Sequence, residues 1–447
     1  MRIALFFHFI AIFPPLILIK SKKMKILVLG SGGREHALAW NMQQRGHHEL
    51  FIAPGNPGTA GLGTNVPIGV NDFEAIGGFC REKQIEMVVV GPEEPLVKGI
   101  WDFFQAEPAL KEILFIGPSR FGAQLEGSKA FAKAFMERQS IPTAGYREFT
   151  EANFTEGIRY LESHPLPVVL KADGLAAGKG VVICQTNEQA VAEFEAMIQE
   201  AKFGEASRKV VVEEFLSGIE MSVFLVTDGK EYVVLPQAKD YKRIGEKDSG
   251  LNTGGMGAVS PVPFADAAFM QKVTDRIIRP TVDGFYKEKI HYTGFVFIGL
   301  IKVDDDPYVI EYNCRMGDPE TEVVMPRLKN DIAAICRAAA EHRLSEIRVE
   351  EDPRTAVTVM AVSGGYPGDY EKGFKIMGLD QPLDDAILFQ AGTKVSDGHI
   401  VTSGGRVLCA TAYGNTVSEA VSRSKAILEQ VHFDDMYYRR DIGYEFS

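Results

Sequence analysis

Short apolar runs alternate with amphipathic stretches over the first third of the chain. Lys25 to Leu29 form an apolar run that ends in Gly30-Ser31-Gly32-Gly33, and residues 34–44 then carry apolar side chains at helical spacing. This succession is typical of a buried parallel strand that turns into a helix. Because further runs follow, the pattern predicts an α/β fold whose N-terminal domain, up to about residue 124, is an open, doubly wound parallel sheet. The further runs are 50–53, 87–90 and 114–116.

The remainder of the chain predicts mixed α+β structure and then a small β-rich C-terminal domain. Helical patterns cover residues 128–139 and 331–342. Residues 294–313 predict two strands joined by the acidic turn Asp304-Asp305-Asp306. The other expected strands are 167–171, 209–213, 221–227, 356–363, 386–390 and 406–413.

Length and composition narrow the class of protein. A chain of 447 residues exceeds one hydrophobic core, so we expect roughly three domains. The formal charge of -12 argues against nucleic acid as a partner, because phosphate backbones are bound by clustered Lys and Arg. The five cysteines are widely spaced and lack CxxC or Cys/His metal patterns. We therefore expect reduced thiols and a cytoplasmic protein.

The first 23 residues do not fit this picture. Residues 3–19 are apolar apart from His8, and lysines follow where a signal peptide would need a small-residue cleavage site. A run of this length lies at the lower limit for a transmembrane helix, about 17 residues. Met24 then opens a complete strand-turn-helix unit. We expect an upstream start codon chosen in error, so that residues 1–23 lie outside the native protein; a membrane anchor is the alternative.

The glycine turn at residues 30–33 is a candidate anion site. Glu35 breaks the GxGxxG spacing of dinucleotide-binding turns, and no acidic residue ends the second predicted strand. NAD is therefore not expected. A glycine-rich turn before a helix still presents backbone N–H groups, which favours a substrate phosphate. A tight turn without a ligand remains the alternative.

The segment from Lys171 to Val181 is the most informative in the chain. Lys171 ends a predicted strand, and a loop with Gly174, Gly178, Lys179 and Gly180 follows. Backbone amides approach phosphate oxygens only where side chains are absent, and ammonium groups offset the negative charge. The segment predicts a cover over a triphosphate. The alternative is an ordinary glycine hairpin with solvated lysines.

A second candidate is the strand at residues 211–216, which turns polar before Gly218. The backbone of Glu214 and Leu216 could meet an adenine edge, Glu213 could accept from its amine, and Glu220 could reach the ribose hydroxyls. An edge strand without a ligand is the alternative.

The strand that ends at Asn313 predicts a metal site. Glu311 and Asn313 share one face because side chains alternate along a strand, and two hard oxygen ligands suit Mg²⁺ that takes further ligands from phosphates. Arg315 continues that face and could hold a transferring phosphoryl group. The alternative is a polar sheet face with a surface salt bridge.

Two further segments have fewer distinguishing features. Asp318 could contact a substrate amine or cap the following helix. The glycines of residues 252–257 favour close approach of a ligand to the backbone.

Taken in order, these segments resemble the ATP-grasp ligases, and among them the glycinamide ribonucleotide synthetase family. The resemblance covers residues 24–447. The matching segments are GSGGREHALAW, APGNPGT, VVGPEEPLVKG, QLEGSKAF, LKADGLAAGKGV, EEFLSG, LNTGGMGAVSP, YTGF, IEYNCRMGDPETE, GGYPGDY and TSGGRVL.

The resemblance implies an N-terminal substrate-binding domain at 24–124, an ATP-grasp domain at 125–345 and a C-terminal domain at 346–447. Residues from about 147 to 212 would form a mobile subdomain that covers the nucleotide. The implied activity is ligation of glycine to 5-phosphoribosylamine with ATP and Mg²⁺ or Mn²⁺, through glycyl phosphate, in de novo purine synthesis. We expect a monomer without a membrane partner.

The resemblance also assigns roles to individual residues. Glu311 and Asn313 would bind the metal, and Arg315, Lys171 and Asp318 would act in catalysis. Nucleotide contacts would be Lys129, Lys171, Gly174, Gly178, Lys179, Gly180, Glu213, Glu214, Leu216 and Glu220. Substrate contacts would be Gly32, Gly33, Arg34, Glu93, Lys239, Asp240, Lys242, Arg243 and Asp318.

Rival hypotheses remain open at this point. Another ATP-grasp enzyme could carboxylate or formylate a purine precursor, and a regulatory protein could bind ATP without turnover. Release of ADP that depends on glycine distinguishes the ligase from both.

Overall fold

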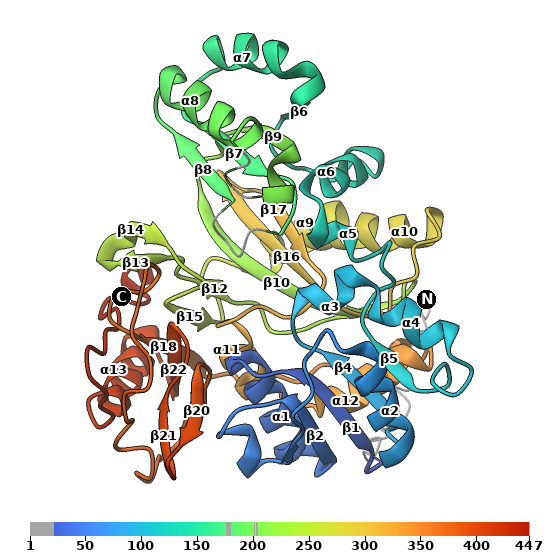
Figure 1. Ribbon diagram of the computed structural model, residues 1–447, viewed down its shortest axis with the longest axis vertical. Helices are drawn as coiled ribbons and strands as arrows, with labels where there is room; N and C mark the ends of the chain where they lie inside the picture. Colours follow the sequence, from blue (N-terminus) through green and yellow to red (C-terminus); the bar gives the residue numbers. More distant parts are fainter. Residues whose placement is uncertain (1–21, 176–179, 201, 203, 447) are drawn as a thin grey trace, which may run out of the picture.

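The computed structural model describes residues 22–446 except 176–179, 201 and 203, so the apolar leader lies outside the described residues (Figure 1). The N-terminal domain lies beside the C-terminal domain, and a central sheet stands above both and carries a smaller sheet at its far end (Figure 1). No helix within the described residues is long and apolar enough to cross a membrane.

An open parallel sheet forms the N-terminal domain. Its strands are β1 (Lys25–Gly30), β2 (Glu49–Pro54), β3 (Thr64–Asn65), β4 (Met87–Val90) and β5 (Leu114–Ile116), in the order β3-β2-β1-β4-β5. Its helices are α1 (Gly33–Gly46), η1 (Thr59–Gly61), α2 (Phe73–Lys83), α3 (Glu93–Lys98), α4 (Ile100–Ala106) and α5 (Gln124–Gly127). The predicted parallel sheet is confirmed. The glycine turn lies at the carboxyl end of β1, the edge at which open parallel sheets bind ligands.

Two helices from much later in the chain, α11 (Thr321–Arg327) and α12 (Ile332–Ala340), pack against this domain. The buried Asn41 of α1 connects them to it. Its Nδ2 donates to the carbonyl of Met325 at 3.2 Å, and its Oδ1 accepts from the N–H of Ile332 at 2.9 Å. These contacts hold the acidic turn before α11 close to the N-terminus of α1.

The central sheet is antiparallel and carries the predicted metal strand. Its strands are β10 (Ile219–Thr227), β11 (Tyr232–Val234), β16 (Gly294–Val303) and β17 (Asp306–Asn313), in the order β11-β10-β16-β17. Helices α6 (Lys129–Arg138), α9 (Ala267–Val273), the π-helical turn η5 (Thr274–Ile278) and α10 (Arg279–Lys287) accompany it. A bulge interrupts the β16–β17 pairing, because Gly299 faces Glu311 and Leu300 faces Val309. Bulges re-aim side chains, and this one precedes Glu311 directly.

The smaller sheet has a hydrophobic core of its own. It consists of β6 (Tyr146–Thr150), β7 (Val168–Ala172), β8 (Val181–Cys184) and β9 (Lys209–Glu214), in the order β6-β9-β7-β8. Helices η2 (Glu151–Asn153), α7 (Phe154–Glu162), α8 (Asn187–Ile198) and η3 (Gly204–Arg208) cover it, and Phe149, Leu161 and Phe194 lie in the core. A separate core allows a unit to move as a body. Motion of residues 147–212 stays a prediction.

The C-terminal sheet combines strands from two parts of the chain. The expected strands are β18 (Thr355–Val362), β19 (Ala386–Gln390) and β22 (Arg406–Gly414). Strands β12 (Lys239–Asp240) and β15 (Gly257–Ser260) extend the sheet to the order β12-β15-β18-β22-β19. The small hairpins are β13 (Arg243–Gly245) with β14 (Ser249–Asn252), and β20 (Thr393–Ser396) with β21 (His399–Thr402). The remaining helices are η4 (Glu246–Asp248), η6 (Leu344–Glu346), α13 (Val417–Leu428) and η7 (Tyr444–Phe446).

Candidate active site

Two of the lysines predicted to bind phosphate, Lys129 and Lys171, lie at the junction of the small and central sheets. Lys171 of β7 is 6% exposed, and its Nζ donates to the carbonyl of Ile310 at 3.2 Å. Lys129, in the first turn of α6, donates to the carbonyl of Gly174 at 3.1 Å. Because Lys171 is buried, the alternative of solvated lysines is wrong for this residue. The loop itself is described only in part, since Gly178 and Lys179 lie outside the described residues.

The described glycines of this loop lie against other backbone. A Cβ on Gly174 would come within 2.8 Å of the Cβ of Ala206. The carbonyl of Gly180 accepts from the N–H of Ala172 at 2.8 Å. These contacts define the two ends of the loop.

The strand β9 lies between β6 and β7, so the alternative of an edge strand is wrong. Glu213 is 3% exposed, and its Oε2 pairs with Lys171 at 2.9 Å and with Lys133 at 3.1 Å. Its Oε1 is buried and has no hydrogen-bond partner among the described residues. A buried oxygen without a donor fits a ligand donor such as an adenine amine. That assignment stays a prediction.

The segment that follows β9 is partly committed to other contacts. The N–H of Glu214 donates to the carbonyl of Gly145 at 3.0 Å, and its carboxylate accepts from the N–H of Gly145 at 2.8 Å. The backbone of Leu216 makes no hydrogen bond with the described part of the chain. The N–H and carbonyl of Leu216 are therefore available for a ligand, whereas the N–H of Glu214 is already used within the protein.

Glu311 lies among positive charges from four different segments. Burial raises the pKa of this carboxyl, but Lys242, Lys171, Lys129 and Arg315 together hold the pKa below its usual value. Glu311 is therefore ionised at neutral pH. A carboxylate held ionised by several cations suits a polyphosphate that arrives with a divalent ion.

Asn313 is buried at the end of the same strand, and its Nδ2 has no partner among the described residues. Within the part of the chain that the structure describes, no group of three His, Cys, Asp or Glu side chains could enclose a metal ion. Glu311 and Asn313 would thus form only part of a coordination shell. That is the arrangement expected where phosphates supply the other ligands.

Arg315 connects the predicted metal strand to the N-terminal domain. Its guanidinium pairs with Glu126 of α5 at 2.8 Å and with Glu93 of α3 at 3.4 Å. Burial raises the pKa of Glu93, but Arg315 and Arg34 lower it overall. Burial raises the pKa of Glu126 more than Arg315 lowers it. The pair Arg34 and Arg315 also shares one acceptor, the carbonyl of Met316, at 3.3 and 3.2 Å.

The acidic turn faces the N-terminus of α1. Asp318 pairs with Arg406 of β22 at 2.9 Å, and a Cβ on Gly32 would lie 3.2 Å from Asp318 Oδ2. Glu320 is the N-cap residue of α11 and makes no side-chain cap bond. The alternative in which Asp318 caps this helix is therefore wrong. A Cβ on Gly33 would come within 2.2 Å of the buried Glu322 Oε1, so this position has no room for a side chain.

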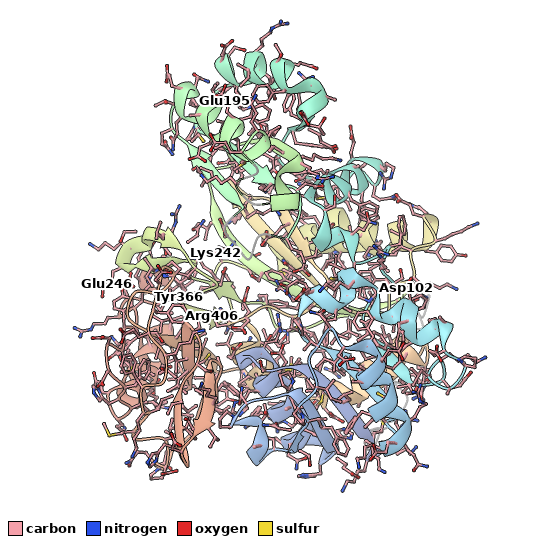
Figure 2. The ribbon with its side chains drawn as sticks, viewed as in Figure 1. Asp102, Glu195, Lys242, Glu246, Tyr366 and Arg406 are labelled. Atoms are coloured by element: carbon pink, nitrogen blue, oxygen red, sulfur yellow. The ribbon has the colours of Figure 1, made fainter. Side chains whose placement is uncertain are left out.

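The predicted substrate contacts at 239–243 run from β12 of the C-terminal sheet to the first residue of β13 in the hairpin. Lys242 Nζ donates to Glu220 Oε2 at 2.7 Å, and Lys242 is the main cause of a lowered pKa for Glu220. Burial raises the pKa of Asp240. Arg243 donates to the carbonyl of Gly250 at 2.8 Å and points along the hairpin. Lys242, Tyr366 and Arg406 gather where the C-terminal domain meets the central sheet, whereas Asp102 and Glu195 lie on outer helices (Figure 2).

Sequence reasoning missed three charged residues of this site. Glu126 anchors Arg315, Lys133 shares Glu213 with Lys171, and Arg406 holds Asp318. Lys133 lies four residues after Lys129 and so on the same helical face, which was a usable signal. Glu126 and Arg406 carried no local signal, because their partners are far away in the sequence.

The comparisons with known proteins agree over most of the chain from residue 24 onward. Residues 24–126, 127–321 and 356–445 match the N domain, the ATP-grasp (A) domain and the C domain of the phosphoribosylglycinamide synthetase family. A phosphoribosylamine–glycine ligase of Escherichia coli O157:H7 is 47% identical over 427 residues, which cover 94% of this chain and 98% of that protein.

Two solved structures extend this likeness to three dimensions. The phosphoribosylamine–glycine ligase of Thermotoga maritima has a TM-score of 0.81 at 35% identity, covering 93% of this chain and 99% of the other. The biotin carboxylase domain of a Hydrogenobacter thermophilus 2-oxoglutarate carboxylase, at 18% identity, has a TM-score of 0.69 over 93% of this chain and 92% of the other. The second likeness shows a common fold alone.

Proposed function

The chain belongs to the phosphoribosylglycinamide synthetase family, and from this premise we propose that it uses ATP to join glycine to 5-phosphoribosylamine. The products are N1-(5-phospho-D-ribosyl)glycinamide, ADP and phosphate. This is the second step of de novo purine biosynthesis. The five cysteines are free and buried, which supports the cytoplasm as the compartment.

The reaction needs two displacements. A carboxylate oxygen of glycine attacks the γ-phosphorus of ATP, ADP leaves, and glycyl phosphate forms. The amine nitrogen of phosphoribosylamine then attacks the acyl carbon, phosphate leaves, and the nitrogen gives up a proton. Activation is required because a carboxylate has no good leaving group until its oxygen is phosphorylated.

The described side chains can serve the first displacement. Lys129 and Lys171 hold phosphate oxygens and offset their charge, and Arg315 steadies the acyl phosphate against the side of the N-terminal domain. Glu311 and Asn313 fit a hard divalent ion, Mg²⁺ or Mn²⁺, because one oxygen donor is an ionised carboxylate and the other a buried amide. When bound, the ion would offset the negative charge that develops on the transferring phosphoryl group.

The second displacement would take place next to the N-terminal domain. The amides at the start of α1, with Arg34, can hold the phosphate of the ribosylamine. Asp318 faces Gly32 and can accept a hydrogen bond from the amine. Glu213, Leu216 and Glu220 are the proposed adenosine contacts on the opposite side.

A single observation carries this proposal most directly: Glu311 is held ionised by cations that come from α6, β7, the 239–243 segment and the residues after β17. Such convergence is expected of a site built for a metal-bound triphosphate rather than of a surface ion pair.

The test is ADP release by the purified chain with ATP, Mg²⁺, glycine and freshly generated phosphoribosylamine, each omitted in turn. We expect release only with all four. Release that is indifferent to glycine and requires bicarbonate or formate would place the chain among other ATP-grasp enzymes. Binding of ATP without any ADP release would indicate a regulatory protein.

A further inference from the structure

The hairpin segment, residues 239–252, carries Lys239, Lys242 and Arg243; β12 at its start pairs with β15, but the hairpin beyond it has little support of its own. Its strands β13 and β14 form a two-stranded sheet that pairs with no other strand in the described chain. Isolated two-stranded hairpins are marginally stable in water. Contacts from elsewhere must therefore hold this segment in one conformation.

The base of the hairpin segment is tied to the residues that follow it. The carbonyl of Lys242 accepts from the N–H and the Oγ1 of Thr253, at 2.7 and 2.8 Å. The N–H of Tyr241 donates to the carbonyl of Gly257 at 3.0 Å. Within the described part of the chain, the far end around Asp248 has no such backbone hydrogen bond to another segment.

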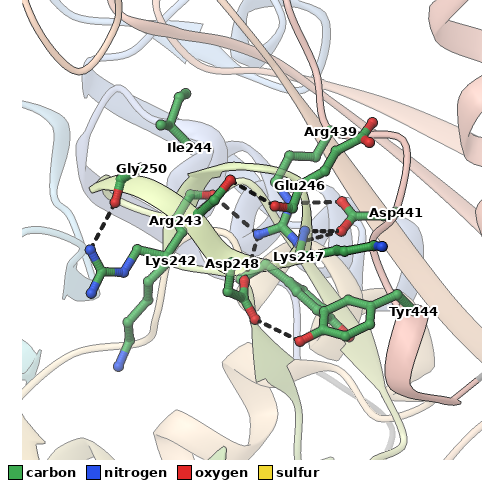
Figure 3. A network of polar contacts seen from close by, with 12 residues as sticks. Lys242, Arg243, Ile244, Glu246, Lys247, Asp248, Gly250, Arg439, Asp441 and Tyr444 are labelled. Atoms are coloured by element: carbon green, nitrogen blue, oxygen red, sulfur yellow. Dashed lines mark hydrogen bonds and ion pairs between the residues drawn. The ribbon is translucent and has the colours of Figure 1, made fainter.

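The far end is held by the C-terminal tail, residues 437–446 (Figure 3). Arg439 has a fully buried side chain and pairs with Asp248 Oδ1 at 2.6 Å. The same guanidinium donates to the carbonyl of Arg243 at 3.2 Å and binds both carboxylate oxygens of Asp441, at 2.8 and 2.9 Å. Asp441 in turn accepts from the N–H of Lys247 at 2.6 Å. One side chain thus connects the first strand of the hairpin, β13, and the turn that follows it, η4, to the tail.

Hydroxyl groups of the tail add two further contacts with the hairpin. Tyr444 donates to Asp248 Oδ2 at 3.1 Å, and Tyr437 donates to the carbonyl of Ile244 at 2.9 Å. The tail therefore binds the first strand, β13, and the turn between the strands, η4.

Glu445 acts at the base of the segment. Its two carboxylate oxygens meet Lys239 Nζ and the hydroxyl of Tyr241, each at 2.8 Å. Tyr241 is buried, and its ring lies beneath Lys239 Nζ at 4.1 Å. This places the ammonium group of Lys239 between a carboxylate and an aromatic face.

We propose that the C-terminal tail is a positioning element for nucleotide binding, in which Arg439 and Glu445 fix the hairpin segment so that Lys242 stays directed at Glu220 and Glu311. The proposal rests on the proposed function, because it takes these two carboxylates to be ribose and metal contacts. Neither Arg439 nor Glu445 is a catalytic residue. Each acts through Lys242 or Lys239.

The test compares four variants of the full chain. Arg439→Ala removes all contacts of the guanidinium, Arg439→Lys keeps the charge but cannot reach every acceptor, and Glu445→Gln removes the charge beside Lys239. Arg440→Ala is the matched control, because Arg440 is the exposed neighbour in the same tail and its side chain makes no hydrogen bond or ion pair with the described residues. The measured quantities are kcat, the KM values for ATP and glycine, and the melting temperature.

We expect Arg439→Ala to raise the KM for ATP about tenfold, since small misplacement of a binding group weakens it by one to two orders of magnitude. The KM for glycine should stay within about twofold of the wild-type value. The KM for ATP of Arg439→Lys should lie between those of the wild type and Arg439→Ala. All kinetic values of Arg440→Ala should match the wild type. A merely structural role lowers the fraction of folded enzyme, so kcat falls while every KM is unchanged. That result, or an unchanged KM for ATP in both Arg439→Ala and Glu445→Gln, would overturn the proposal.

Two safeguards keep the outcome decisive. If Arg439→Ala does not fold, Tyr444→Phe and Asp248→Asn each remove one contact with the far end, and the same split between the KM values is expected. Calorimetric binding of Mg–ADP without glycine or ribosylamine measures the positioning effect independently of turnover. If the wild-type chain binds Mg–ADP but forms no ADP from ATP in the turnover assay, the proposed function fails, while the binding measurement still tests the role of the tail.

Discussion

Replacing Arg406 by Met should disable the amine side of the site while leaving the nucleotide side intact. Arg406 Nη1 donates to the carbonyls of Gly254 at 2.6 Å and Asp318 at 2.7 Å, and Nη2 pairs with Asp318 Oδ1 at 2.9 Å. Met retains the length of the side chain and loses all three contacts. Asp318 then has no ion-pair partner in the described chain.

The size of the effect follows from these contacts. A hydrogen bond from a charged donor contributes about 1.5–3 kcal/mol, and loss of one partner of a buried ion pair costs about 3–5 kcal/mol. Arg406 and Asp318 retain 20% and 13% of their side-chain exposure, and three contacts that share one guanidinium do not add. We therefore take about 3 kcal/mol for the disruption around Asp318. If all of it is lost in the transition state, kcat/KM for phosphoribosylamine falls on the order of 100-fold.

The assay is steady-state ADP release with each substrate varied in turn. We expect kcat/KM for phosphoribosylamine to fall between about tenfold and 100-fold, while the KM for ATP stays within about twofold. Arg354→Met is the matched control, because Arg354 pairs with Asp352 at 2.8 Å and not with the acidic turn. An unchanged kcat/KM for phosphoribosylamine, or an equal rise in the KM for ATP, would refute this reasoning.

Three other substitutions test the site from different directions. Glu311→Ala should lower the ligation rate by about 1000-fold or more without changing the circular dichroism spectrum. Asp306→Ala, on the same strand, should not lower the ligation rate. Turnover by Glu311→Ala at saturating Mg²⁺ would contradict the metal role. Burial and then Asp318 raise the pKa of Glu322. This carboxyl keeps its proton in the folded chain above its unfolded pKa of about 4.3, so stability falls as pH rises through that window. Between pH 5 and pH 8, the melting temperature of Glu322→Gln should therefore rise relative to that of the wild type. If the melting temperatures of both proteins depend equally on pH, the proposed protonation of Glu322 is wrong. Gly33→Ala forces a Cβ to within 2.2 Å of Glu322 Oε1, so it should prevent folding or substrate binding. In Gly61→Ala the added Cβ meets nothing within 4 Å, so the melting temperature and the activity should not change.

The fold was predictable from the sequence where the spacing of apolar residues determines a helix or strand locally. The parallel strands of the N-terminal domain and the two strands around Asp304 lie where the apolar runs place them. The shared face of Glu311 and Asn313 was predictable for the same reason. The bulge at this strand falls before Glu311 and so leaves the alternation after it intact.

The composition of the C-terminal sheet was not predictable in this way. Strands β12 and β15 are short, and they leave the central part of the chain to pair with β18. Nothing in the hydrophobic pattern of a short strand identifies its partner, because the pairing depends on tertiary packing. The predicted boundary near residue 345 therefore marks a change in sequence pattern, and the sheet continues across it.

The ion pairs that complete the site explain why local motifs were weak evidence individually and strong evidence in order. Glu311 obtains its environment from Lys129, Lys171, Lys242 and Arg315, each carried by a different element. No segment contains both the carboxylate and its cations apart from the short stretch 311–315, so no single spacing could reveal the arrangement. The partners of Asp318 and Lys239, which are Arg406 and Glu445, come from still later segments. A site assembled from several distant parts of one chain can be inferred from the succession of its fragments, but its charge balance depends on how the parts pack together. Substitutions at Arg406 or Arg439, far from the glycine loop in the sequence, should for that reason separate the contribution of packing from that of the motifs.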